Sequence, residues 1–418
     1  MFVQWKLAHF ALLFGTSFVI GLALLTMLQA RIANYWPLGV DAYSHLAGVR
    51  AFWQGESPYA EAVTHEAEQL VYGRARHADE APFPFTYPAY LALILLPITW
   101  IPASQVGIVW GAAMWAILAT LILVWSLGLT PRPKPILWGL LVLSGILFRP
   151  ALVSIINGQY ALFVVGCTFL AWLLITRKAD AWVGIPLVLA TIKPSVGMFL
   201  PIVLLIWALR WRRWKILASF ILVLGVLMAA TIFQIGWWLP DLAYHTLTYS
   251  ALRQGIGLAW SAEQIATIPG AIWLTLSLVV LIIGLLQMWR AESFPWLALI
   301  GALNLNLLLT PHSVEYDLTL LLIVLFWLGR QWQRTRWGLP LLILLFWAPW
   351  LSSLIVSMTG GLIELWWRGV WMFYPSILLC VTLIWLAWLR KKSSVAARAA
   401  ALDAVSTQSG NVQVTADL

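Results

Sequence analysis

Long runs of apolar residues cover most of the chain, and short polar or basic segments separate them. A helix needs about 20 such residues to cross the roughly 30 Å of hydrocarbon in a bilayer. We interpret seven runs as transmembrane helices, at residues 8–30, 103–129, 216–238, 268–289, 294–309, 338–357 and 370–389.

Shorter apolar runs predict further helices, some of them broken, tilted or re-entrant. They lie at 86–101, 136–148, 160–176, 181–192, 195–209 and 317–329. Because lipid offers no partners for backbone hydrogen bonds, such a chain can span the membrane only as a helical bundle. We therefore predict an all-α integral membrane protein, a polytopic bundle of about 11 to 13 transmembrane helices.

The basic residues between the runs predict the orientation of the bundle. Lys6 precedes the first run, and further clusters lie at 177–178, 210–215, 290, 330–336 and 390–392. Since such clusters favour the cytoplasmic side, we expect both chain ends there. Alternation then places the following segments outside: 31–85, 149–159, 193–194, 239–266, 310–317 and 358–369.

One segment leaves the early topology open. If 86–101 and 103–129 both crossed the membrane, Arg132 and Lys134 would lie outside, against the charge rule. Either 86–101 is re-entrant, or the loop with these two cations departs from the rule.

The first outer loop, residues 31–85, contains two stretches with helical spacing of apolar residues, 43–53 and 60–72. They predict helices that lie on the membrane surface. Residues 393–418 are small and polar, which predicts a disordered cytoplasmic tail. We thus divide the chain into one membrane domain, 1–392, and this tail.

The composition agrees with a membrane protein and excludes a soluble one. Of the 418 residues, 62% are hydrophobic and 10% are charged, and many of the 29 tryptophans flank apolar runs, where indoles anchor helices at the interface. The net charge of +9 comes from the clusters that set topology. We therefore expect contacts with membrane lipids and no binding of nucleic acid.

Asp41 is the first candidate for chemistry, since it follows the first helix by about ten residues and precedes the first surface helix. A carboxylate at this place can act as general base on a hydroxyl. It can equally cap the helix through its side-chain oxygen. The spacing alone favours capping.

Polar residues also interrupt the apolar runs at 149–159, where Arg149 and the amides of Asn157 and Gln159 are found. Amides at a helix break can satisfy freed backbone groups or hydrogen-bond sugar hydroxyls. The sequence leaves both roles open.

Lys193 lies between two apolar runs that are too short to cross a bilayer comfortably and whose far ends are both cytoplasmic. The lysine is thus placed in or near the outer half of the membrane, where a cation needs an anionic partner. A lipid phosphate or a protein carboxylate can serve.

A late polar turn contains His312, Glu315 and Asp317 between apolar helices. Histidine there can assist proton transfer or bind phosphate, although a lone histidine in a loop is often structural. Cys167 and Cys380 have no metal-ligand spacing, and we expect no metal and no cofactor.

Five short motifs, taken in order, resemble glycosyltransferase family 87, a polytopic family with the C-type glycosyltransferase fold. They are DAYSHLAGVRAFWQGESPY (41–59), FTYPAYLALILLP (85–97), NGQ (157–159), IKP (192–194) and LTPHS (309–313). Each motif is weak by itself, and the ordered series over about 35–320 is more specific.

The resemblance implies inverting, metal-independent transfer of a sugar, commonly mannose, from a polyprenyl-phosphate donor to a glycolipid or glycan acceptor outside the cell membrane. It implies that Asp41 is the catalytic base and that Lys193, His312 and Arg149 face the donor phosphate. The remaining polar residues of this region are candidates for sugar or acceptor binding: Tyr43, Tyr59, Tyr87, Asn157, Gln159 and Glu315.

One departure from the family pattern is visible. The family usually has two prolines after the re-entry tyrosine, whereas Tyr87-Pro88 is followed here by Ala89. Two alternatives to transfer stay open: a lipid or sugar transporter that uses Lys193 and Arg149 for binding, and a noncatalytic scaffold subunit. Transporters usually show inverted repeats, and no such symmetry is evident in the sequence.

Overall fold

Helices make up all the regular structure in the part of the chain that the computed structural model describes, residues 7–32, 37–252, 265–310, 315–358 and 374–391. Six of them are long and apolar enough to cross a membrane. These are α1 (Leu7–Ile32), α5 (Ala103–Leu127), α6 (Pro135–Ile146) together with α7 (Arg149–Asn157), α12 (Trp214–Ile235), α15 (Ile268–Arg290) and Tyr374–Lys391.

Shorter helices complete the bundle. They are α8 (Ala161–Thr176), α9 (Gly184–Ala190), α10 (Pro194–Gly197), α11 (Phe199–Arg210), α16 (Trp296–Leu309) and α17 (Leu322–Trp332), with the 3₁₀ segments η3 (Asp180–Trp182) and η4 (Glu315–Leu321). The helix α18 (Gly338–Met358) has 21 residues and covers the predicted run 338–357. The described residues thus form an all-helical structure with several candidate spans, as predicted. It does not establish the predicted count of about 11 to 13 spans.

Two predictions about spans need correction. The run 294–309 forms α16, whose 14 residues reach only about 21 Å and do not belong to the six long spans. Residues 149–157, expected in an outer loop, form α7 and continue the span that α6 begins. Pro150 permits this because proline fits the first turn of a helix, where its missing N–H is not needed.

The segment 86–101 does not form a spanning helix. It contains the four-residue α4 (Leu91–Ile94) and the 3₁₀ helix η2 (Leu96–Trp100). Pro97 and Pro102 interrupt it, and so short an element cannot cross 30 Å. The structure therefore favours the re-entrant alternative.

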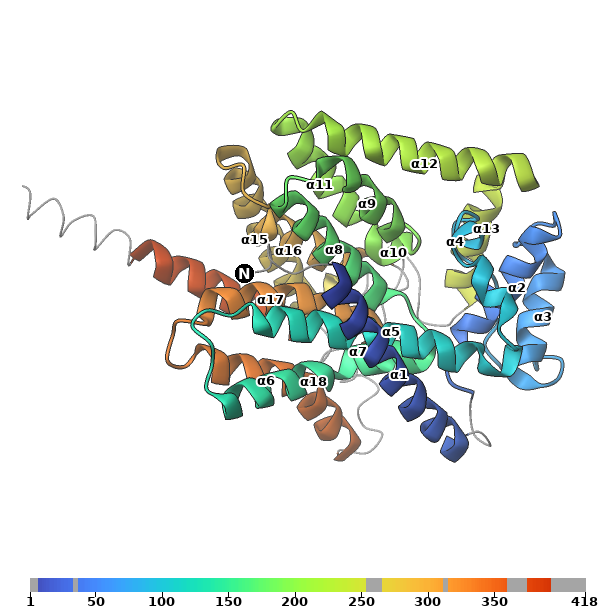
Figure 1. Ribbon diagram of the computed structural model, residues 1–418, viewed down its shortest axis with the longest axis horizontal. Coiled ribbons are helices and arrows are strands. Elements are labelled where there is room, and N and C mark those ends of the chain that lie inside the picture. Colours follow the sequence, from blue (N-terminus) through green and yellow to red (C-terminus); the bar gives the residue numbers. More distant parts are fainter. Residues whose placement is uncertain (1–6, 33–36, 253–264, 311–314, 359–373, 392–418) are drawn as a thin grey trace, which may run out of the picture.

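Helices form at both predicted stretches, as α2 (Asp41–Trp53) and α3 (Glu61–Tyr72), and their placement on the membrane surface stays a prediction. They pack against each other through a small apolar cluster that includes Tyr43, Ala47, Val63 and Ala67. Figure 1 shows both at one end of the bundle, beside α13 (Leu239–Leu252). Residues 393–418 lie outside the described part, so their predicted disorder stays a prediction.

Candidate functional site

Three glycines bring the start of α2 against the bundle. Gly39 has a φ of +67°, and a Cβ there would lie 2.5 Å from the Cα of Gly107 in α5. A Cβ on Gly107 would lie 1.8 Å from the carbonyl oxygen of Leu38, and Gly158 (φ +79°) also contacts Gly39. The Gly39 N–H donates to the Ile156 carbonyl at 2.7 Å. Because only glycine allows backbones so close, these contacts fix the turn before Asp41.

Asp41 is the first residue of α2, and its carboxylate faces the bundle. Val40 occupies the N-cap position, with no side-chain cap hydrogen bond. The Asp41 Oδ2 atom instead accepts a hydrogen bond from Nε2 of Gln159, which follows α7. Asp41 therefore does not occupy the N-cap position that the spacing favoured, although a carboxylate in a first turn still interacts favourably with the helix dipole.

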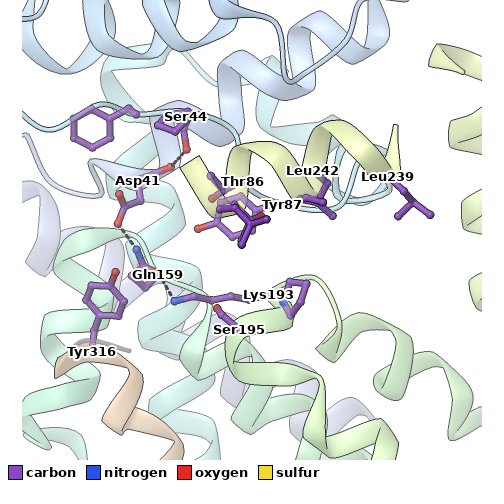
Figure 2. Close-up of a pocket in the computed structure, with 16 residues that line it drawn as sticks. Asp41, Ser44, Thr86, Tyr87, Gln159, Lys193, Ser195, Leu239, Leu242 and Tyr316 are labelled. Atoms are coloured by element: carbon purple, nitrogen blue, oxygen red, sulfur yellow. Dashed lines mark hydrogen bonds between the residues drawn. The ribbon is translucent and has the colours of Figure 1, made fainter. Parts of the chain in front are cut away.

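Gln159 joins Asp41 to Lys193, as Figure 2 shows. Lys193 donates from Nζ to the Gln159 Oε1 atom at 2.7 Å and to the Asp317 Oδ1 atom at 2.8 Å. A lysine ammonium only donates and an ionised carboxylate only accepts. The amide of Gln159 can satisfy both neighbours in one orientation alone, with oxygen toward Lys193 and nitrogen toward Asp41.

Lys193 is buried, with 8% of its surface exposed, and Asp317 is 0% exposed. The ring of Tyr316 lies 4.7 Å from the Lys193 Nζ atom, in cation–π geometry. Of the two partners that the sequence left open for the lysine, the structure shows a carboxylate. Phosphate binding by Lys193 stays a prediction.

These residues line a cavity of about 510 Å³, which we call the Asp41 cavity. One side is polar and carries Asp41, Gln159, Lys193 and Tyr316. The opposite side is largely apolar and comes mainly from α13, through Leu239, Leu242, Ala243, Thr246 and Leu247. Figure 2 shows Leu239 and Leu242 on this helix, across from the polar side chains. The cavity thus suits a molecule with one polar and one apolar part.

His45 lies one helical turn after Asp41 and is completely buried. Its ring packs against the rings of Tyr87 at 4.6 Å and Tyr160 at 4.7 Å. Burial, with a smaller contribution from the Lys193 charge, lowers the pKa of His45 to about 3. The imidazole is therefore neutral at physiological pH, and neither nitrogen makes a hydrogen bond of ordinary geometry.

Arg149 and Glu315 lie beside the Asp41 cavity without lining it. They form an ion pair with each other, and the Arg149 guanidinium lies 5.8 Å from the Trp350 ring. This pair joins α7 to η4, because a charge that is largely withdrawn from water needs an opposite charge beside it. The structure does not bring Arg149 to Lys193 as a second cation.

The other predicted residues divide into a lining group and a structural group. Tyr87 lines the cavity, and its carbonyl accepts a hydrogen bond from the Tyr59 hydroxyl at 2.7 Å. Tyr43 is buried between α2 and α3. Asn157 donates to the Val153 carbonyl at 2.9 Å within α7. His312 lies outside the described residues.

The sequence analysis did not predict the contacts that Asp317, Tyr316 and His45 make at the site. The late polar turn pointed to Asp317, but only the fold places it against Lys193. His45 had a usable signal, because residues i and i+4 share a helix face and Asp41 was already a candidate. Among the described residues, no group of three or more His, Cys, Asp or Glu side chains has a metal-binding arrangement.

Comparison with known proteins gives one match. The model of glycosyltransferase family 87 matches residues 85–311, which is more than half of the chain. The matched region begins after α3, includes Gln159 and Lys193, and ends at the late polar turn. No curated protein and no solved structure matches the chain.

Proposed function

This chain belongs to glycosyltransferase family 87, and from that premise we propose that it transfers a sugar, mannose or a related hexose, from a polyprenyl-phosphate donor to an acceptor hydroxyl. Asp41 is the general base in this proposal. The observation that carries it is the Asp41 cavity, in which a carboxylate and an ammonium group stand on either side of one amide.

Lys193 suits the donor phosphate because it uses two of its three ammonium donors for Gln159 and Asp317. The third can bind a phosphate oxygen. A fixed cation at that place stabilises the charge that develops on the leaving group. Asp317 keeps the ammonium in position in the absence of donor.

The apolar wall of α13 suits the first units of a prenyl chain. Leu239, Leu242 and Leu247 provide it, opposite the polar side chains. A donor with its phosphate at Lys193 can extend its hydrocarbon along this wall toward lipid.

In the proposed reaction, Asp41 removes the proton from the acceptor hydroxyl while the oxygen attacks the anomeric carbon. The bond between that carbon and the phosphate oxygen breaks, and polyprenyl phosphate leaves with the electron pair. Attack opposite the leaving group inverts the anomeric centre. The proton ends on Asp41 and returns to solvent when product leaves.

We place the Asp41 cavity on the outer face of the cell membrane. If 86–101 is re-entrant, Arg132 and Lys134 join the other basic clusters on the cytoplasmic side, in agreement with the charge rule. The cavity then lies at the opposite face, with both chain ends in the cytoplasm.

The test is transfer by proteoliposomes given radiolabelled polyprenyl-phosphate mannose and extracted acceptor lipids. We expect Asp41→Asn to reduce product formation by about 10²- to 10⁴-fold, the usual contribution of a general base. The matched control is Asp79→Asn, in an exposed position of the same outer segment. Wild-type rates with Asp41→Asn would refute the base, and passage of the labelled lipid without a new glycosidic bond would show a transporter.

A further inference from the structure

A second cavity of about 730 Å³ lies at the other end of the bundle. It is formed where α8, α15 and α17 end, near the beginning of α16 and the end of the helix Tyr374–Lys391. α8 runs from the neighbourhood of Gln159 to this cavity, a length of about 24 Å for its 16 residues. The two cavities are therefore separate.

Three cationic side chains line this second cavity, Lys178, Arg213 and Arg330, and we call it the basic cavity. Arg213 is neutralised by two hydrogen bonds to Asp180, at 2.8 and 2.7 Å. The salt bridges between described residues include neither Lys178 nor Arg330. Glu292 is the one carboxylate in the lining, so the two cations exceed it by one charge.

Lys178 occupies a position where glycine is preferred. It has a φ of 58° and follows the end of α8, where the Lys178 N–H donates to Ile175 and the Ala179 N–H donates to Leu174. This hydrogen-bond pattern is the Schellman motif, whose left-handed residue is usually glycine. A lysine in this conformation strains the backbone. It does place a cation at the basic cavity.

Aromatic and apolar side chains make up the rest of the wall. Trp172, Trp296 and Trp327 line it together with Leu386 and Leu389, and the Arg330 guanidinium lies 5.0 Å from the Trp172 ring. Tryptophan at this level of a membrane protein marks the head-group region. Basic pockets between helices at the cytoplasmic side bind anionic lipid head groups.

We infer that the basic cavity binds the phosphate head group of an anionic phospholipid from the leaflet at this end. Lys178 and Arg330 hold the phosphate, and the tryptophan and leucine side chains contact the acyl chains. This site is separate from the Asp41 cavity and does not depend on the reaction proposed there.

The test measures lipid retention by native mass spectrometry on delipidated protein titrated with dioleoyl phosphatidylglycerol or dioleoyl phosphatidylcholine. We expect one phosphatidylglycerol to bind more tightly than phosphatidylcholine. Lys178→Gly and Arg330→Gln should each weaken it roughly fivefold. Lys178→Gly also relieves the strained backbone, so loss of folding cannot explain the result.

Arg212→Gly is the matched control. Arg212 has a φ of 54° after α11, in the same hydrogen-bond pattern, but it does not line the basic cavity. Its removal should change retention less than twofold. Equal losses in Arg212→Gly and Lys178→Gly would show general surface attraction and overturn the inference. The inference would also be overturned if millimolar inorganic phosphate stabilised the protein and phosphatidylglycerol gave no further stabilisation. The ligand would then be free phosphate.

Discussion

The two cavities differ in whether their charged residues have protein partners, although Arg213 at the basic cavity is paired with Asp180. At the Asp41 cavity each charged group meets a partner from another part of the chain: Asp41 meets Gln159, and Lys193 meets Asp317. At the basic cavity, Lys178 and Arg330 are exposed and enter none of the salt bridges between described residues. A buried charge needs a protein partner, whereas an exposed cation without such a partner can attract an anionic ligand. Substitutions should therefore damage the fold at the first cavity and binding alone at the second.

The largest expected effect comes from breaking the buried pair. Asp317→Asn leaves the Lys193 ammonium without its buried counter-charge, so we expect the free energy of unfolding to fall by about 3 to 5 kcal/mol. Denaturant titration in detergent measures it. The control is Glu66→Gln, which breaks the half-exposed pair with Arg50 and should cost less than about 1 kcal/mol. Equal losses of unfolding free energy in the two variants would contradict the difference between buried and exposed charge pairs.

The next effect concerns the glycine contact that positions Asp41. Gly107→Ala should destabilise the protein by about 1 to 3 kcal/mol, because the new methyl group overlaps the Leu38 carbonyl oxygen. It should also reduce sugar transfer, since the turn before Asp41 must move. Gly139→Ala in α6 is the control, with no atom within 4 Å of the added Cβ. Full activity in Gly107→Ala would mean that the turn tolerates displacement.

A pH effect of intermediate size is expected from His45. Its folded-state pKa of about 3 lies below the ordinary 6.5, so the unfolded chain binds more protons and stability falls as pH drops below about 6.5. Between pH 7 and pH 5 this loss amounts to about 2 kcal/mol. In His45→Gln, the unfolding free energy should depend less on pH over that interval. An unchanged slope would show that other groups cause the acid sensitivity.

The smallest effect is expected at the basic cavity. Lys178→Gly relieves a left-handed lysine, a strain of about 1 to 2 kcal/mol, but adds flexibility to the unfolded chain. The net change in lipid-free detergent should be a gain of no more than about 1 kcal/mol. Thermal unfolding measures it. A clear loss of stability would mean that Lys178 has a structural partner, and the contrast between the two cavities would weaken.

Hydrophobic patterning predicted the helical fold well because long apolar runs in lipid have few alternatives. The runs at 103–129 and 216–238 became α5 and α12, and the spacing of apolar residues gave α2 and α3 within two residues. It failed at two places. Pro150 begins α7 instead of ending the span, and the run 294–309 forms a helix that is too short to belong to the long spans.

Single residues of the site could be predicted from the sequence, but the contacts between them could not. Asp41 and Lys193 were noticed because ionisable groups are costly near a membrane. Their connection through Gln159 could not be predicted, because positions 41, 159 and 193 meet only through tertiary packing. The backbone contact between Gly39 and Gly107 depends on two distant segments in the same way.

Because the Gln159 amide must point its oxygen and its nitrogen to different neighbours, it restricts which residues can occupy positions 41, 159 and 193. A glutamate at 159 would turn a second carboxylate toward Asp41, and a lysine would turn a second ammonium toward Lys193. If the charges at 41 and 193 were exchanged, the same glutamine would still fit after half a turn of its amide. Positions 41 and 193 should thus covary in a sequence alignment, with the amide at 159 retained whenever these two positions keep opposite charges.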